Sequence, residues 1–427
     1  MRGMDDPHGP LRGEEAGELL RLTLQASGLE LRDWRRTHLF ERPGAEASAI
    51  FSAEAFDEDR RVVLHLVGST VRLSDAQRRA VGAVCLSPAG DAPGGSSPVH
   101  IWPHPADPEL PGLPTACDAV RLGGRISAAF GEQVTVEHLS MLVLRPLRRA
   151  VLRASLSTTA GTRTVYVKVL RPQRAALQLS RHRLLPLGPE AVDLGEGIVL
   201  LEQAAGLPLT EHLHHPGSRP GTAAAALERL SLKDLLSPVG ALNTSGGAHE
   251  EIMSLPRRTS QTDRLEDYAR VAVRAGADQE RISALCRDIR RNLCPEPGPL
   301  VPTHGDLHPA NIFLELSPAA EVPGLKPTAL RPSALIDLDS LGPGLRADDL
   351  ACLLAHLWTL PTLDPDGYRV VPELTRRLVG EAAQEHCPRD LGARIAGVLL
   401  SLLPSAQTGD RREAWLSLAE GSLQDCD

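Results

Sequence analysis

The sequence predicts an α+β fold in which strands come first and helices follow. Between residues 38 and 206, apolar residues alternate with polar ones or form short runs, the pattern of strands. From about residue 209 the apolar residues recur at helical spacing, and only short strands interrupt them. Because strands and helices occupy separate stretches instead of alternating, the order argues against a parallel-sheet protein.

The first part of the chain predicts one small sheet with flanking helices. Leucines at helical spacing indicate an opening helix over residues 13–28, and residues 38–69 read as three strands joined by turns. Ser74 is a suitable N-cap for a helix that follows. Gly, Pro and Ser residues predict a loop over 87–98, before a further strand at 99–105.

A second three-strand pattern over residues 139–172 repeats the first. Aligning VVLHLVG with VYVKVLR sets His65 opposite Lys168. The repeat is either a duplicated sheet in which the first copy lacks the lysine, or two unrelated three-strand meanders.

The remaining chain is predicted as helices around a few short strands. A helix is expected at 173–187, then a strand at 197–206, and a polar stretch at 237–261 predicts a mobile surface loop. Further helices are expected at 221–231, within 264–293, and from Arg346 onward with breaks at 361–367 and Pro388. We therefore divide the chain into three segments: 1–125, 126–205 and 206–427.

Composition excludes several classes of protein. The 427 residues are 42% apolar and 23% charged, with a net charge of −8 and a pI near 6.0, so no basic surplus favours nucleic acid or an anionic membrane. The N-terminus lacks the apolar core of a signal peptide, and no run of about 18 apolar residues predicts a membrane span. The seven cysteines form no CxxC pair, which favours a cytoplasmic protein without disulfides or zinc.

Residues 304–311, HGDLHPAN, carry the strongest chemical signal. Asp306 lies five residues before Asn311 in a short loop, and the apolar run ALI ends at Asp337. Phosphoryl transfer needs one carboxylate to orient a hydroxyl, and an amide oxygen with a second carboxylate to hold magnesium. Protein kinases use HRDxxxxN and DFG for these roles. The alternative is that Asp and Asn are ordinary turn residues here.

Lys168 is a further candidate because it lies within the apolar strand VYVKVL. A buried lysine needs an anion, and an ATP phosphate is a suitable one. Alternatively, it lies on the solvent side of an edge strand, where lysine guards against aggregation.

THGDLHPANIF, followed by ALIDLDSLGPGLRADDLACLLAHL, resembles the aminoglycoside phosphotransferase and choline kinase superfamily. The likeness covers about residues 138–360. It implies a bilobal protein-kinase-like fold with a β-rich N-lobe and a mainly helical C-lobe, preceded here by an additional N-terminal α+β unit of unknown role.

The resemblance also implies a role for each matching residue. Asp306 would be the catalytic base, Asn311 and Asp337 would be Mg²⁺ ligands, and Lys168 would contact the nucleotide phosphates. Backbone groups of Glu202, Gln203 and Ala204 would bind adenine, and His304 would support the catalytic loop. Asp339 would be a second acid near the metal or a turn former. For Asp348 and Asp349 the sequence favours an N-capping role at the following helix.

Two features depart from the family pattern. The lysine partner is usually a glutamate on the next helix, whereas this chain offers Gln178, with Glu190 or Glu196 just beyond. The turn SLSTTAGTRT also lacks GxGxxG.

These observations predict an ATP- or GTP-dependent phosphotransferase that uses Mg²⁺ and phosphorylates a hydroxyl of an aminoglycoside, a sugar or an amino alcohol. The alternative is a catalytically weak nucleotide-binding protein with a regulatory or scaffolding role. A protein kinase is disfavoured, because no APE-like anchor follows Asp337. We expect no nucleic-acid or membrane partner, and acceptor specificity in residues 237–261 and the final helices.

Overall fold

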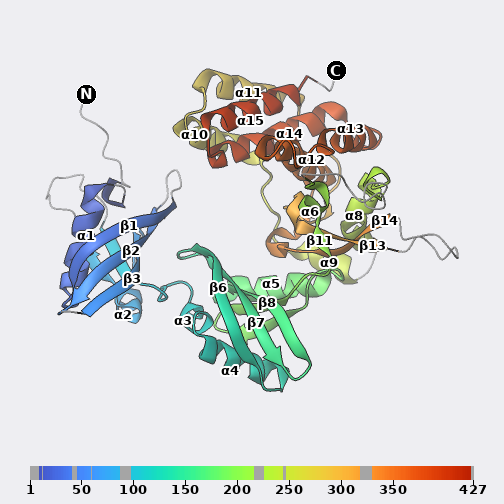
Figure 1. The fold of residues 1–427 in the computed structure, drawn as a ribbon. Coiled ribbons are helices and arrows are strands. Elements are labelled where there is room, and N and C mark those ends of the chain that lie inside the picture. Colours follow the sequence, from blue (N-terminus) through green and yellow to red (C-terminus); the bar gives the residue numbers. More distant parts are fainter. Residues whose placement is uncertain are drawn as a thin grey trace. The chain divides into compact units, whose positions relative to one another are not determined.

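A computed structural model describes residues 9–11, 13–40, 46–58, 60–86, 98–215, 226–243, 247–317 and 329–424. The chain forms two compact units: Met1–Leu179 with Ala191–Gln203, and Ser180–Glu190 with Ala204–Asp427. The first unit contains two five-stranded sheets and the second is mainly helical, which confirms the predicted α+β fold class (Figure 1). The predicted segment 1–125 lies in the first unit, and so does 126–205 except for Ser180–Glu190 and residues 204–205, which belong to the second.

The first sheet is antiparallel, with strand order β1-β2-β3-β5-β4. Ser74 accepts a hydrogen bond from Gln77 N–H, and the Gln77 side chain accepts one from Ser74 N–H, so the predicted N-cap is confirmed as a capping box. Residues 87–97 of the predicted loop lie outside the described residues. The elements are α1 (Glu14–Gln25), β1 (Glu30–Phe40), β2 (Ser48–Asp57), β3 (Arg60–Ser69), α2 (Asp75–Val81), β4 (Val84–Leu86) and β5 (Val99–Pro103).

The second sheet has the corresponding order, β6-β7-β8-β10-β9. It follows the same succession of one helix, three strands, one helix and two strands, and it begins after the short helix α3 (Leu113–Ala116). Its elements are α4 (Ala119–Phe130), β6 (Thr135–Arg145), β7 (Arg149–Thr158), β8 (Gly161–Leu170), α5 (Pro172–Leu184), β9 (Ala191–Gly195) and β10 (Ile198–Glu202). This shared topology favours duplication over two unrelated meanders.

Strand register corrects the sequence alignment of the two copies. The β2–β3 hairpin pairs Ser48 with Ser69, and the β7–β8 hairpin pairs Arg149 with Leu170. Matching these ends sets Lys168 against Val67, so its alignment with His65 is wrong by two residues. Side chains two residues apart on a strand lie on the same face. A shift of two residues therefore leaves the pattern of apolar residues unchanged, so the pattern could not show the error.

In the first sheet, the position that corresponds to the lysine is apolar and covered. Val67 is buried with Trp102 and with Leu147, which lies in the turn between β6 and β7. Leu147 N–H donates to Asp107 Oδ2 at 2.8 Å, and Arg171 Nη2 donates to Leu147 O at 3.0 Å. Apolar packing of Val67 and Trp102 with Leu147 therefore joins the two sheets, and a hydrogen bond ties Leu147 to the segment that connects them.

We expect Trp102→Ala to lower the free energy of unfolding by about 3–5 kcal/mol, because it removes a fully buried indole and leaves a cavity. Urea unfolding measures the change. Val120→Ala is the control, since Val120 is 85% exposed and should change stability by no more than about 0.5 kcal/mol. Equal effects of the two substitutions would contradict the packing described.

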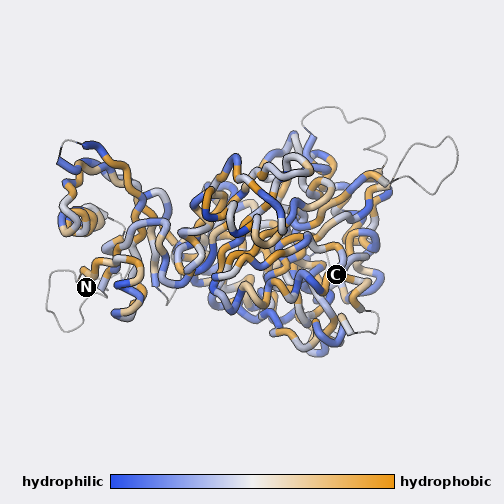
Figure 2. Tube along the Cα trace, turned by 90° about the horizontal axis from the view of Figure 1, so that it is seen from below, coloured by the Kyte–Doolittle hydropathy of each residue, from blue (hydrophilic) through white to orange (hydrophobic). Residues whose placement is uncertain are grey.

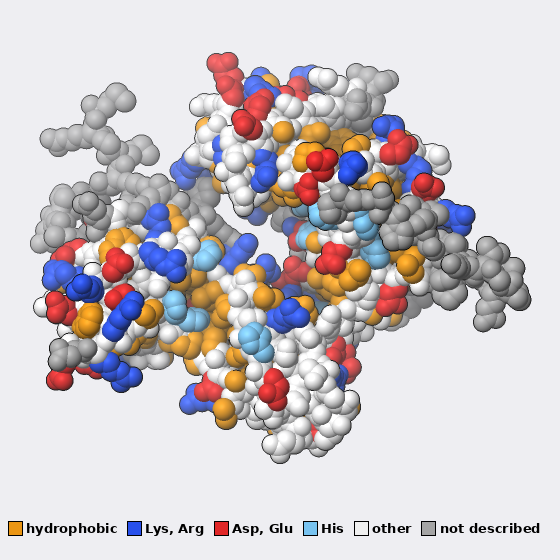
Figure 3. Space-filling view, viewed as in Figure 1, with side chains coloured by type: hydrophobic (Ala, Val, Ile, Leu, Met, Phe, Trp, Pro, Cys, Tyr) orange, Lys and Arg blue, Asp and Glu red, His pale blue; other side chains and the backbone are white. Residues whose placement is uncertain are grey.

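The surface of the first unit carries apolar side chains along one edge strand. Met141, Leu142 and Val143 on β6 are exposed, and hydrophobic side chains gather over this strand (Figure 3). Basic and acidic side chains are interspersed on the face shown, which agrees with the weak net charge. An edge strand of this kind is open to pairing with another strand.

The second unit packs leucine-rich helices around two small sheets, of strand order β11-β13-β14 and β12-β15. Hydrophobic and hydrophilic residues alternate along its helices (Figure 2), as packing on a shared core requires. The strands are β11 (Leu207–Pro208), β12 (Val301–Thr303), β13 (Ile312–Ser317), β14 (Ala329–Leu335) and β15 (Gly342–Gly344). The helices are α6 (Leu209–Leu213), α8 (Leu232–Gly240), α9 (Gly247–Ser254), α10 (Leu265–Arg274), α11 (Gln279–Asn292), α12 (Arg346–Leu363), α13 (Val371–Ala382), α14 (Pro388–Leu402) and α15 (Gly409–Gly421).

The mobile loop predicted over 237–261 is wrong for most of its described residues. The end of α8 and all of α9 lie in it, and Val239 and Ile252 are fully buried. This stretch forms helices because its apolar residues are spaced to face the core, despite the polar turn-forming residues between them. The helix predicted at 221–231 falls partly outside the described residues. None of the described helices has the length and apolar character of a membrane span.

Candidate active site

The loop after β12 is fixed by His304 and Gly305. The buried His304 ring accepts the Asp306 N–H at Nδ1 (3.2 Å), and its Nε2 donates to Ile336 O (3.0 Å), a pattern that assigns a neutral ring. Gly305 has a φ of +76°, and a Cβ there would lie 2.6 Å from Ser340 O. Only glycine fits this position without moving the backbone.

Asp349 also holds this loop, which corrects the N-capping role expected for Asp348 and Asp349. The N-cap of α12 is Leu345. Asp349 is 1% exposed, and its two carboxylate oxygens accept the N–H groups of His304 and Gly305, each at 2.8 Å. Burial raises the pKa of the Asp349 carboxyl, while the two N–H groups that it accepts oppose the rise.

The structure brings together three residues predicted from the sequence. Asn311 Nδ2 donates to Asp306 O at 2.9 Å, which turns the Asn311 amide oxygen to the other side. Ile336, the residue after β14, donates its N–H to Asn311 O at 3.1 Å, so Asp337 is next in sequence to a residue bonded to Asn311. Asp337 itself has left-handed backbone angles at the start of a 3₁₀ turn.

This donor set fits magnesium. A carboxylate and an amide oxygen are hard ligands, and Mg²⁺ usually takes one or two carboxylates, with substrate phosphates and water completing its shell. Among the described residues, no group of three or more His, Cys, Asp or Glu side chains is placed to hold a metal ion. The arrangement therefore suits a metal that arrives with phosphates better than a zinc-type site.

Asp339 is held through its backbone. Arg181 Nη1 donates to Asp339 O, and Arg181 Nε donates to Leu341 O at 2.9 Å. Sequence reasoning missed Arg181, because no local pattern links it to a segment so far along the chain. A role for the Asp339 carboxylate stays a prediction.

A cluster of side chains that sequence reasoning did not assign to catalysis surrounds the Asp306 carboxylate. Arg258 Nη1 lies 3.4 Å from Asp306 Oδ1, and Cys352 Sγ lies 3.9 Å from the same oxygen. Cys352 Sγ is 3.7 Å from His356 Nδ1, and the rings of His308 and His356 are 5.1 Å apart. No motif marks Arg258, Cys352 or His356.

Burial keeps these groups uncharged near neutral pH. It lowers the pKa of His308 to about 4, with a further contribution from His356, and it lowers the pKa of His356. It also raises the pKa of the Cys352 thiol, and the Asp306 carboxylate adds to that rise. Arg258 is therefore the cation of this cluster.

We expect the free energy of unfolding to fall as the pH decreases from about 6.5 to 4. The unfolded chain protonates His308 near pH 6.5, whereas the folded chain does so only near pH 4, so protons favour unfolding in that window. The loss should be roughly 1–3 kcal/mol. Urea unfolding at several pH values measures it, and His308→Gln should flatten the dependence.

His138→Gln is the matched control, since His138 is exposed on β6 and makes the same chemical change. An unchanged pH dependence in the His308 variant would contradict the assignment.

Lys168 lies in the first unit, on a central strand. It is 7% exposed, and β8 pairs with both β7 and β10, so the edge-strand interpretation is wrong. Gln178 is also buried, on α5. Glu196, the alternative lysine partner, instead pairs with Arg125 at 3.0 Å, and Glu190 is exposed.

The segment expected to bind adenine follows β10. The Glu202 side chain pairs with Arg163 at 2.5 Å, and Glu202 is paired with Val165 in the sheet, so binding of adenine by this segment stays a prediction. Gln203 is the last residue of the first unit and Ala204 begins the next part of the second.

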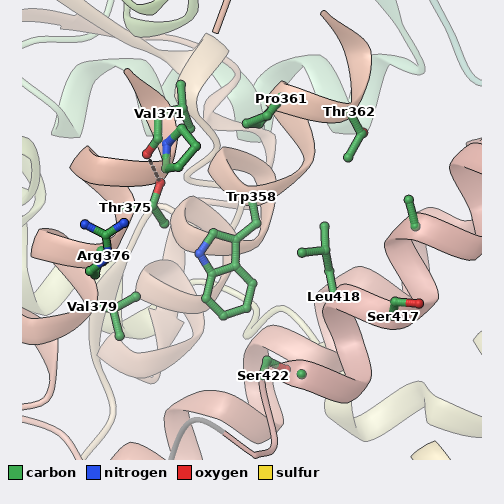
Figure 4. A pocket seen from close by; sticks show the side chains of 13 residues that line it. Trp358, Pro361, Thr362, Val371, Thr375, Arg376, Val379, Ser417, Leu418 and Ser422 are labelled. Atoms are coloured by element: carbon green, nitrogen blue, oxygen red, sulfur yellow. Dashed lines mark hydrogen bonds between the residues drawn. The ribbon is translucent and has the colours of Figure 1, made fainter. Parts of the chain in front are cut away.

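A separate cavity lies among α12, α13 and α15. It has a volume of about 860 Å³, and its walls include Trp358, Val371 and Leu418 (Figure 4). None of the residues predicted from the sequence lines it. Its size alone gives no reason to place the chemistry there, because neither Asp306 nor Asn311 lines it.

Comparisons with known proteins agree with the motif. Residues 156–371 match the model of the phosphotransferase enzyme family, a segment that contains every residue predicted for the site. No curated protein matches the chain.

Several solved structures are similar. Macrolide 2′-phosphotransferase MphH from Brachybacterium faecium is 18% identical, with a TM-score of 0.41 over 71% of this chain and 97% of that one. Aminoglycoside phosphotransferase APH(3″)-Id from Streptomyces rimosus is 20% identical, with a TM-score of 0.36 over 72% and 98%. The ethanolamine kinase of Plasmodium vivax is 12% identical, with a TM-score of 0.38 over 67% and 82%.

Proposed function

The chain belongs to the phosphotransferase enzyme family, and from that premise we propose that it transfers the γ-phosphoryl group of ATP or GTP to a hydroxyl group of a small molecule. The observation that carries the proposal is the loop in which Asn311 is bonded to the Asp306 carbonyl and to the strand that ends before Asp337. A base and a pair of metal-binding oxygens in one rigid segment are what phosphoryl transfer requires.

Asp306 acts as the base. Its carboxylate is one-third exposed, so it can accept a hydrogen bond from the acceptor hydroxyl and take the proton as that oxygen bonds to phosphorus. The bond between the γ-phosphorus and the bridging oxygen breaks at the same centre, and the nucleoside diphosphate leaves. His304 and Asp349 fix the loop, so Asp306 is already oriented before the acceptor binds.

The other residues bind the nucleotide. Asn311 and Asp337 would hold Mg²⁺, which neutralises charge on the phosphates when bound. The Lys168 ammonium would contact the α- and β-phosphates, and the backbone at Glu202, Gln203 and Ala204 would bond to the base. Gln178 on α5 would hydrogen-bond Lys168, a weaker interaction than an ion pair with glutamate.

The test is turnover of ATP and of GTP by the purified full chain, with and without Mg²⁺, in the presence of a hydroxyl-acceptor panel. We expect phosphoryl transfer that stops when EDTA removes the metal. If neither nucleotide is consumed under any of these conditions, the proposed function is wrong.

A further inference from the structure

We propose that Arg258 determines acceptor specificity: its guanidinium selects acceptors with an uncharged or anionic oxygen beside the reacting hydroxyl, and it excludes acceptors with an ammonium group there. The inference rests on the proposed function, because it assumes that Asp306 is the base. It narrows the acceptor classes left open by the sequence, two of which, aminoglycosides and amino alcohols, are cationic.

The first argument is the position of the guanidinium. Arg258 Nη1 lies 3.4 Å from Asp306 Oδ1, and both side chains are about one-third exposed. A hydroxyl bound to this carboxylate therefore has Arg258 as its neighbour. Because both side chains are partly exposed, an acceptor can approach this pair.

The second argument is that this donor lacks a hydrogen-bond acceptor within the described chain. Arg258 Nη1 is buried, and among the described residues no atom accepts a hydrogen bond from it, although the Asp306 ion pair is close. A buried donor of this kind is costly unless an oxygen completes it. A substrate hydroxyl or carboxylate oxygen that binds beside Asp306 would complete it, after a small shift of the guanidinium that exposes Nη1.

The third argument is charge. Besides Arg258, the side chain of Cys352 lies against the Asp306 carboxylate, with its Sγ 3.9 Å from Oδ1. The nearby Asp349 carboxylate is buried and accepts two backbone N–H groups, so it offers nothing to a substrate. An ammonium group bound against this guanidinium would meet a like charge at close range.

The fourth argument is that Arg258 is held in place by the fold. Its segment follows α9 and packs against β15, where a Cβ on Gly342 would lie 3.0 Å from Pro256 O. Downstream, Ser260 is buried and its N–H donates to Asp263 Oδ2 at 3.1 Å. The guanidinium is thus presented by a packed segment, as a specificity residue should be.

The experiment measures kcat/KM of the full chain for matched acceptors. One series is glucose, glucuronate and glucosamine, and a second is ethylene glycol and ethanolamine. A third comparison sets uncharged oligosaccharides against the cationic aminoglycoside kanamycin. In the wild type we expect uncharged or anionic acceptors to exceed their amino counterparts by about tenfold or more. Arg258→Glu should make the amino acceptors the better substrates. Arg258→Gln should shrink the difference in kcat/KM between the two classes of acceptor.

Arg257→Gln is the matched control, since Arg257 is the adjacent arginine, is exposed, and lies 3.9 Å from Asp263. The stabilisation by Mg-ATP should be the same in all variants, which shows that they fold and bind nucleotide. A preference for amino acceptors, no activity with any uncharged or anionic acceptor, or an order unchanged by Arg258→Glu would overturn the inference. Failure of nucleotide turnover altogether would instead remove the proposed function on which it rests.

Discussion

Asp306→Asn should abolish phosphoryl transfer while leaving nucleotide binding intact. The amide has the size of the carboxylate but cannot take the acceptor proton, and a positioned base contributes about 10²–10⁴-fold to such reactions. The Asp306 backbone, which anchors Asn311 and bonds to His304, is unchanged by the substitution. We therefore expect kcat to fall by about a thousandfold, with the thermal shift by Mg-nucleotide preserved.

The control is Asp288→Asn, the same chemical change at an exposed position of α11 that pairs with Arg291. It should leave kcat and stability near wild type, because exposed ion pairs contribute little. If the Asp306 variant keeps a rate within about tenfold of the wild type, below the 10²-fold that a general base contributes, Asp306 is not the base.

Asp349→Asn should damage both the fold and the reaction, although Asp349 lies outside the recognised motif. Both of its oxygens accept backbone N–H groups of the catalytic loop, and an amide turns an NH₂ group toward one of them. The variant loses one hydrogen bond and gains a buried donor without a partner, which costs about 2–4 kcal/mol. Misplacing the loop should also lower kcat about a hundredfold.

Urea unfolding and steady-state kinetics measure the two effects of Asp349→Asn, again beside Asp288→Asn. Since Asp349 acts by positioning the loop, we expect the loss in kcat to exceed any change in KM for the nucleotide. Wild-type stability together with wild-type kcat would show that the loop does not depend on this carboxylate.

Sequence alone could group the candidate residues that lie close together along the chain. His304, Asp306 and Asn311 occupy one short loop, and their hydrogen bonds join residues two to five positions apart. Asp337 could be found because it ends an apolar strand, the place where catalytic side chains are commonly exposed. Lys168 could be found because a charge within an apolar strand is conspicuous.

Long-range partners could not be found in this way. Asp349, Arg181 and Arg258 reach the site only after helices and loops have packed, and each looks like an ordinary charged residue in its own segment. The stretch 237–261 was misread for a related reason, because burial of Ile252 depends on tertiary contacts that polar composition does not reveal.

The repeat of the sheet could be detected in the sequence, but the residue-by-residue alignment of its two copies could not. Alternating apolar residues show which face is buried, yet any shift by two residues preserves that face. Only the pairing of hairpin ends identified Val67 as the counterpart of Lys168.

The measurement that tests the central claim most directly is a thermal shift with Mg-ATP and Mg-GTP, on the wild type and on Asp337→Ala. A ligand at a hundred times its dissociation constant stabilises the folded state by about 2.7 kcal/mol. The account predicts a metal-dependent rise in Tm in the wild type that Asp337→Ala removes, with Asp288→Ala behaving as wild type. No shift with either nucleotide, or an equal shift in the Asp337 variant, would contradict it.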